Sequence, residues 1–242
     1  MNQLRVDTPF KKTIILFLVK ILYRYSDIVA TNSAESSKDL SNYIKRRVKT
    51  IYNPCFENLT LKKKYKKKRK IRILNIARLS HQKDQITILK AINFSKIKNH
   101  IKFTLIGFGP LKQKLLKYIK FNNINAQIIS NKTKLNYYYK NNDLFIFSSL
   151  YEGLPTTLVE ASSFCLPIIS SNFKSGSKEI LLSGKGGYIF QSKNYKKLSD
   201  LIYKFYLNPS SFYKKETLCR KNLYRFSKNK NLKLFNSTLE NI

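Results

Sequence analysis

Two carboxylates, Glu152 and Glu160, have seven residues between them in the stretch YEGLPTTLVEA. A nearly continuous apolar run at 143–148 precedes them and predicts a strand that is buried on both faces. Because Pro is tolerated in a first helical turn, a helix should begin at about residue 155. The start of a helix attracts anions, since its first N–H groups have no partner within the helix. Carboxylates accept hydrogen bonds from sugar hydroxyls. The stretch therefore fits a ligand with a phosphate centre and hydroxyls at both ends, such as a nucleotide-sugar.

The alternative interpretation of this stretch is a surface carboxylate and an unrelated helix-capping one, which is the usual fate of acidic residues. The strand, loop and helix around the two acids favour the binding site. We place the loop and the helix start, which consist of Gly153, Leu154, Pro155 and Thr156, against the phosphate-containing part of the ligand.

A basic pair, Arg78 and Lys83, follows an earlier predicted strand in the segment NIARLSHQKDQ. Basic side chains at the end of a strand can bind a diphosphate and stabilise the charge that develops on it as it leaves. With 47 Lys and Arg residues in the chain, a solvent-exposed role is the expectation for any single one. The placement of this pair after a strand is what makes it a candidate site.

Gly107 and Gly109 lie in the turn IGFGP, between a predicted strand and a helix that starts at Pro110. We place both on the donor side of the site, where glycine permits close backbone approach or positive φ. Their role is expected to be mainly structural, because Gly-rich turns of this kind are frequent in Rossmann-like domains.

Strands and helices alternate from residue 71 onward. The predicted strands are 71–77, 102–107, 126–130, 143–148, 167–170 and 187–190. The predicted helices are 83–98, 110–121, 133–141, 155–164, 177–182, 194–206, 210–225 and 228–241. Such alternation with short connections predicts an α/β fold with a Rossmann-like parallel sheet and helices on both faces. Ligands bind at the carboxyl ends of such strands, which is where the residues named above fall.

The combination of these motifs resembles the retaining family 4 glycosyltransferases, which have the B-type glycosyltransferase fold. The family motifs are E-x7-E at Glu152 and Glu160, the basic motif at Arg78 and Lys83, and G-x-G-P at 107–110. The resemblance implies that Arg78 and Lys83 contact the donor diphosphate, that Glu160 binds the ribose hydroxyls and that Glu152 binds the donor sugar. Glu152, Arg78 and Lys83 would be the catalytic residues. No metal and no cofactor are expected, because D-x-D is absent and the nucleotide-sugar, UDP- or GDP-linked, is itself the substrate.

Before residue 71 the pattern is helix 10–25, strand 27–31, helix 34–46 and strand 48–52. It resembles the last part of the family's N-terminal domain, which normally lies more than a hundred residues into the chain. We therefore expect a remnant of the acceptor-side domain at 1–54, a basic linker at 55–70, the nucleotide-sugar-binding domain at 71–226 and a C-terminal crossing helix at 227–242. The interpretation is a fold with its N-terminal part shortened, either as a truncated enzyme or as half of a split one.

The net charge of +34 predicts attraction to polyanions, anionic lipids and nucleotide diphosphates. Eight of the nine residues at 62–70 are basic, and the apolar run at 14–22 is too short to span a bilayer. Either the run at 14–22 lies at a membrane interface or it is a core helix of an incomplete domain. Three scattered cysteines predict no disulfide framework. We expect a cytoplasmic protein, peripheral at the inner face of the cell membrane.

The expected function is transfer of a sugar, with retention, from a nucleotide-sugar to a lipid-linked or polysaccharide acceptor in cell-surface glycan synthesis. One alternative is a donor-binding fragment that lacks catalysis unless a separate N-terminal half supplies the rest. Another is a basic nucleic-acid-binding protein, but the chain has no recognisable motif for that class. We expect no specific nucleic acid partner.

Overall fold

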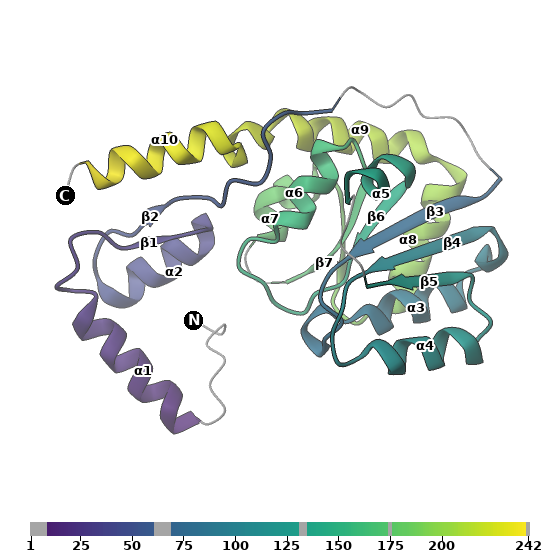
Figure 1. Ribbon diagram of the computed structural model, residues 1–242, viewed down its shortest axis with the longest axis horizontal. Helices are drawn as coiled ribbons and strands as arrows, with labels where there is room; N and C mark the ends of the chain where they lie inside the picture. The colour runs from purple at the N-terminus through teal and green to yellow at the C-terminus, as the bar shows by residue number, and fades with distance from the viewer. Residues whose placement is uncertain (1–8, 61–68, 131–134, 174–175, 241–242) are drawn as a thin grey trace.

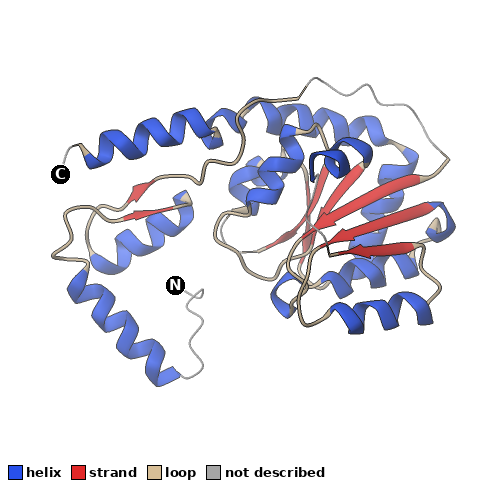
Figure 2. Cartoon of the chain, viewed as in Figure 1, coloured by secondary structure: helices blue, strands red, loops and turns tan. Residues whose placement is uncertain are grey.

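The computed structural model describes residues 9–60, 69–130, 135–173 and 176–240. Most of the basic run at 62–70 therefore lies outside the described residues. Figures 1 and 2 show a sheet domain packed between helices, a smaller N-terminal unit beside it, and a C-terminal helix that extends from the sheet domain over that unit.

The sheet domain contains six parallel strands in the order β5-β4-β3-β6-β7-β8. Their bounds are β3 Ile71–Ile76, β4 Ile101–Ile106, β5 Ala126–Ile129, β6 Leu144–Phe147, β7 Ile168–Asn172 and β8 Tyr188–Gln191. The predicted parallel α/β fold is thus confirmed. The order reverses next to β3, because the chain adds β4 and β5 on one side of it and β6, β7 and β8 on the other. Doubly wound sheets bind their ligands at such a point.

The helices bury the two faces of the sheet in two separate clusters. One face packs on α3 (Gln85–Phe94), α4 (Lys112–Phe121) and α8 (Tyr195–Leu207). The other face packs on α5 (Leu135–Asn141), α6 (Thr156–Ser163), α7 (Ser177–Ile180) and the end of α9 (Pro209–Lys221). All four residues of β6 are buried, which agrees with the continuous apolar run there.

The helices predicted at 83–98 and 210–225 are among those that are shorter than expected. The helix predicted at 83–98 starts only at Gln85, after a separate 3₁₀ turn at His81–Lys83. The break is caused by Asp84, whose φ of 46° is left-handed and does not continue a helix. The helix predicted at 210–225 ends at Lys221, and a 3₁₀ turn covers Leu223–Phe226.

The N-terminal unit contains α1 (Pro9–Leu22), β1 (Ala30–Thr31), α2 (Ala34–Ile44) and β2 (Lys49–Thr50). The two short strands pair in parallel. Ser33 caps α2 by accepting a hydrogen bond from the N–H of Ser36. The C-terminal helix α10 (Lys228–Leu239) reaches this unit, where Lys49 Nζ lies 3.5 Å from Thr238 Oγ1.

Glu179, at the start of α7, joins the N-terminal unit to the sheet domain. Its carboxylate accepts a hydrogen bond from the N–H of Ala34 at 3.2 Å and another from the hydroxyl of Tyr52. Burial, followed by the neighbouring Glu179, raises the pKa of the Tyr52 phenol. The Tyr52 ring meets Phe226 edge to face at 4.8 Å. Glu179 therefore anchors the N-terminal unit to the sheet domain.

Candidate functional site

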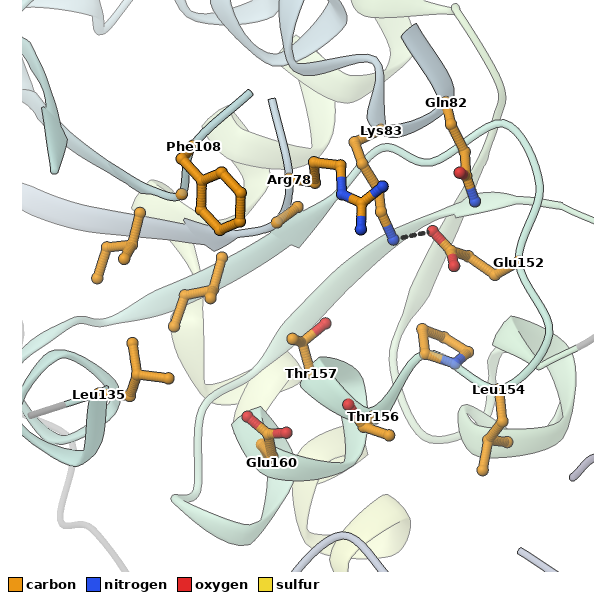
Figure 3. Close-up of a pocket in the computed structure, with 15 residues that line it drawn as sticks. Arg78, Gln82, Lys83, Phe108, Leu135, Glu152, Leu154, Thr156, Thr157 and Glu160 are labelled. Atoms are coloured by element: carbon orange, nitrogen blue, oxygen red, sulfur yellow. Dashed lines mark hydrogen bonds and ion pairs between the residues drawn. The ribbon is translucent and has the colours of Figure 1, made fainter. Parts of the chain in front are cut away.

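A pocket of about 630 Å³ opens at the carboxyl ends of β3, β4 and β6, beside the point where the strand order reverses. Figure 3 shows its side chains. The lining residues are Ile76, Ala77, Arg78, Gln82, Lys83, Ile106, Gly107, Phe108, Leu135, Glu152, Leu154, Pro155, Thr156, Thr157 and Glu160. Most of the residues predicted from three separate motifs thus meet in one cavity.

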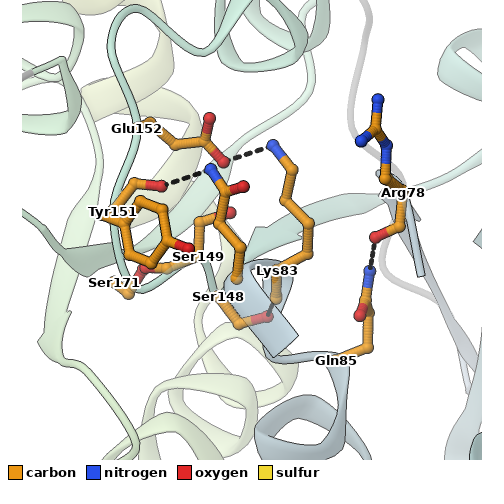
Figure 4. A network of polar contacts seen from close by, with 9 residues as sticks. Arg78, Lys83, Gln85, Ser148, Ser149, Tyr151, Glu152 and Ser171 are labelled. Carbon is orange, nitrogen blue, oxygen red and sulfur yellow. Dashed lines mark hydrogen bonds and ion pairs between the residues drawn. The ribbon is translucent and has the colours of Figure 1, made fainter. Parts of the chain in front are cut away.

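Lys83 and Glu152 form an ion pair inside this pocket (Figures 3 and 4). The pair is largely shielded from water, with 19% of the Lys83 side chain and 12% of the Glu152 side chain exposed. Lys83 also lies 5.6 Å from the centre of the Phe147 ring. The ammonium expected to meet a diphosphate is therefore neutralised by the carboxylate expected to meet the sugar.

Hydrogen bonds between two loops place this ion pair (Figure 4). Gln82 donates its side-chain N–H to the carbonyl of Tyr151 at 2.8 Å, and the N–H of Leu150 bonds to the carbonyl of Gln82 at 2.8 Å. Ser148 donates its hydroxyl to the carbonyl of Lys83 at 2.8 Å. Lys83 and Glu152 are 69 residues apart in sequence, and these contacts fix their separation.

The start of α6 forms another wall of the pocket. The helix begins at Thr156 after Pro155, and no side chain in the described parts of the chain caps its first turn. The N–H groups of such a turn are suited to an anion. In Figure 3, Arg78 and Lys83 approach from the side of the pocket opposite Thr156 and Thr157. Two positive side chains and a helix start thus face the same space.

Glu160 lies on α6 at the other end of the pocket from Lys83 (Figure 3). Its carboxylate oxygen Oε2 accepts a hydrogen bond from the hydroxyl of Tyr139 at 2.8 Å. Phe108 and Leu135 line the cavity on the side away from Glu152 in Figure 3 and give it an apolar wall there. Phe108 is 51% exposed, so an aromatic face is open to a ligand there.

Gly107 lines the pocket, whereas Gly109 and Gly153 are not among its lining residues in the described parts of the chain. Both glycines of the 107–109 turn lie against the loop after β3. A Cβ on Gly107 would be 1.9 Å from the carbonyl oxygen of Ala77, and one on Gly109 would be 2.4 Å from that of Leu79. These contacts support the expected structural role of both glycines.

The residues at the pocket that sequence reasoning missed include Gln82, Thr157, Phe108 and Leu135 in its lining and Tyr139 behind it. Gln82, Thr157 and Phe108 adjoin predicted residues in the same motifs, so their position in the sequence was a usable signal. Tyr139 is buried, and its hydroxyl donates a hydrogen bond to Glu160. No local sequence signal indicated that contact. Among the described residues, no group of three or more His, Cys, Asp or Glu side chains could bind a metal ion.

The family model described as glycosyl transferases group 1 matches residues 57–234, which is most of the chain. The chain belongs to this family. The resemblance to the retaining family 4 glycosyltransferases is thereby confirmed. An uncharacterized glycosyltransferase of Methanocaldococcus jannaschii is 31% identical over 185 residues, covering 69% of this chain and 45% of the relative. This glycosyltransferase chain thus has family relatives in archaea as well as bacteria.

Among bacterial relatives, a Campylobacter jejuni transferase is 26% identical over 187 residues, covering 76% of this chain and 51% of its own. It is named the GalNAc-alpha-(1->4)-GalNAc-alpha-(1->3)-diNAcBac-PP-undecaprenol alpha-1,4-N-acetyl-D-galactosaminyltransferase. Among solved structures, Anabaena HepE in complex with UDP aligns with a TM-score of 0.82 at 17% identity, over 97% of this chain and 69% of that one. This likeness confirms the fold as the Rossmann-like half of a B-type glycosyltransferase. The chain spans about half the length of the curated relatives it matches.

Proposed function

We propose that this chain binds a nucleotide-sugar and supplies the donor side of a retaining sugar transfer. The observation that carries the proposal is the pocket at the strand-order reversal, which brings Arg78, Lys83, Glu152 and Glu160 together. Two cations, a helix start and two carboxylates suit a diphosphate with a hydroxyl-bearing group at each end.

Each side chain then has one role. Arg78, Lys83 and the start of α6 bind the diphosphate and stabilise the negative charge that it gains as it leaves. Glu160 accepts hydrogen bonds from the ribose hydroxyls, and Phe108 gives the nucleobase an aromatic face. Glu152 accepts hydrogen bonds from the donor sugar. The nucleotide that we propose is UDP, which is supported by the likeness to HepE in its complex with UDP.

The proposed acceptor is a lipid-linked or polysaccharide glycan at a membrane surface. The Campylobacter jejuni relative, named for an undecaprenol-linked glycan, supports this class. In the structure, α1 exposes apolar side chains beside Lys20 and Arg24; Phe17 is 61% exposed and Leu22 is 58% exposed. No described helix is both long and apolar enough to cross a bilayer. Contact with an anionic membrane through α1 and the basic residues at 62–70 is therefore part of the proposal.

In our proposal, transfer also needs acceptor-side structure beyond the described part of the N-terminal unit. The N-terminal unit has a sheet of only two short strands in its described part, and the apolar face of α1 is exposed beside it. The alternative of a donor-binding module without turnover uses the same pocket. Turnover of a nucleotide-sugar with and without an added acceptor-side domain distinguishes a transferase from a donor-binding module.

Isothermal titration of the purified chain with UDP and with GDP tests donor binding. We expect one site for UDP, and we expect Glu160→Ala to weaken it about tenfold to a hundredfold, as for loss of a hydrogen bond to a charged group. Arg78→Ala should also weaken UDP binding, whereas the exposed control Arg47→Ala should not. Equal effects of Arg78→Ala and Arg47→Ala would mean that UDP responds only to the overall charge, and the proposed site would be wrong.

A further inference from the structure

Tyr139, on α5, contacts the carboxylate of Glu160 on α6 from outside the pocket lining. Its hydroxyl donates a hydrogen bond to Glu160 Oε2 at 2.8 Å. Glu160 lines the pocket, whereas Tyr139 does not. Any ligand that reaches Glu160 therefore meets a carboxylate with one oxygen already bonded to the protein.

Packing fixes the Tyr139 ring. The side chain is 1% exposed. The ring stacks on Phe164 with centroids 5.2 Å apart and an interplanar angle of 9°, and it lies 6.0 Å from Phe145. A ring enclosed in this way cannot swing its hydroxyl away from Glu160 without disrupting the core. The orientation of the Glu160 carboxylate is therefore set by the core between α5, α6 and β6.

The protonation state of Tyr139 agrees with a permanent donor. Burial raises the pKa of its phenol well above the usual value, and the nearby Glu160 raises it further. The hydroxyl hence stays protonated over the whole range in which the protein would work. It donates to Glu160 throughout that range.

We propose that Tyr139 is a positioning residue that holds Glu160 in the orientation needed to bind the ribose hydroxyls of the nucleotide. The inference rests on the proposed function, because it assigns the ribose to Glu160. A free glutamate side chain loses rotamer freedom when it binds, whereas one that is already oriented does not. Tyr139 thus increases both the affinity for the nucleotide and the discrimination against nucleotides that lack a ribose hydroxyl.

The test uses UDP, 2′-deoxy-UDP and 3′-deoxy-UDP with four proteins: wild type, Tyr139→Phe, Glu160→Ala and the double variant. Tyr138→Phe is the matched control, since Tyr138 is on the same helix and its ring packs against Tyr137 at 5.4 Å. We expect Tyr139→Phe to weaken UDP about threefold to tenfold, the loss expected for one hydrogen bond. The ratio of the affinity for UDP to the affinity for the deoxy analogue that binds less tightly should fall by a similar factor. Tyr138→Phe should change neither value.

A purely structural Tyr139 would not alter the ratio between UDP and its deoxy analogues. In the Glu160→Ala background, adding Tyr139→Phe should have no further effect on UDP binding, because the residue acts through Glu160. Chemical denaturation of each variant shows whether it is folded at the titration temperature. If Tyr139→Phe is folded and keeps the wild-type ratios, or if its effect is equal with and without Glu160, the inference is wrong. Absence of UDP binding by the wild type would instead overturn the proposed function and this inference together.

Discussion

Lys83 and Glu152 form an ion pair in the pocket, and each is expected to bind a different part of the donor. A diphosphate that reaches Lys83 must therefore compete with the carboxylate of Glu152. A nucleotide-sugar compensates for the loss of the ion pair, because its sugar offers hydroxyls to the displaced carboxylate of Glu152. A plain nucleoside diphosphate offers none. We therefore expect the pair to favour the sugar-bearing nucleotide over the plain nucleoside diphosphate.

Glu152→Gln should raise the affinity for UDP and lower that for the UDP-sugar. Removing one charge of a largely shielded pair frees the ammonium of Lys83, and a change of about 1 kcal/mol, or fivefold, is expected for UDP. Isothermal titration with UDP and with UDP-glucose measures both values. Glu35→Gln, on α2, controls for the change in net charge. Weaker binding of UDP by Glu152→Gln would contradict this role for the pair.

Gly107→Ala should destabilise the sheet domain. The new Cβ would clash with the backbone carbonyl of Ala77, which is 1.9 Å away and cannot move independently of β3. We expect the free energy of unfolding to fall by at least about 2 kcal/mol. Gly184→Ala is the control, because its φ of 92° is also unfavourable but its new Cβ would come no closer than 3.9 Å to a neighbouring atom. A denaturant titration that shows the same loss for both variants would rule out the clash as the cause.

Tyr52→Phe should weaken the junction between the N-terminal unit and the sheet domain. It removes the hydrogen bond to the Glu179 carboxylate, for which about 1.5 kcal/mol is expected. The pKa of the Tyr52 phenol is higher in the folded protein than in the unfolded chain, where it is about 10. The hydrogen bond therefore contributes fully to the free energy of unfolding below about pH 10, and this contribution is lost as the pH rises further. The melting temperature of Tyr52→Phe should thus differ less from that of the wild type at pH 10.5 than at pH 7. Tyr43→Phe, on α2, should show no such difference at either pH.

Cys55 should react slowly with iodoacetamide. Burial, followed by the charge of Glu160, raises the pKa of its thiol to about 12. Only the thiolate is nucleophilic, so the rate should rise about tenfold per pH unit from pH 8 to pH 10 without levelling off. Mass spectrometry of the Cys55 peptide follows the rate. Glu160→Gln should increase the reaction rate at pH 8. A rate that levels off near pH 9 would instead indicate a thiol with an ordinary pKa.

Vesicles that contain anionic lipid should bind the chain more strongly than neutral vesicles, and added salt should weaken this binding. Each basic residue near the surface contributes about 1 kcal/mol at low salt. The double variant Phe17→Ser/Leu22→Ser should reduce co-sedimentation because it removes exposed apolar area from α1. Phe121→Ser, at a 90% exposed position on α4, is the control and should bind like wild type. Equal pelleting with neutral vesicles would contradict a role for the charge.

The sequence by itself determined the parallel α/β fold and which residues follow the strands. Local patterns suffice for this, because a buried parallel strand reads as a short apolar run and the next helix begins after Gly or Pro. Arg78, Gly107 and Glu152 could therefore be assigned to strand ends from the sequence pattern alone. The helix boundary at Gln85 could not, because the left-handed Asp84 has no distinctive local signal.

The tertiary structure alone decided which of these strand ends are neighbours and which side chains touch. The strand order places β3 next to β6, and only this adjacency lets Lys83 meet Glu152 across 69 residues of sequence. Tyr139 meets Glu160 because α5 and α6 pack on the same face of the sheet. Such contacts depend on the packing of whole elements and on the direction of each side chain, and neither is encoded in the residues next to them.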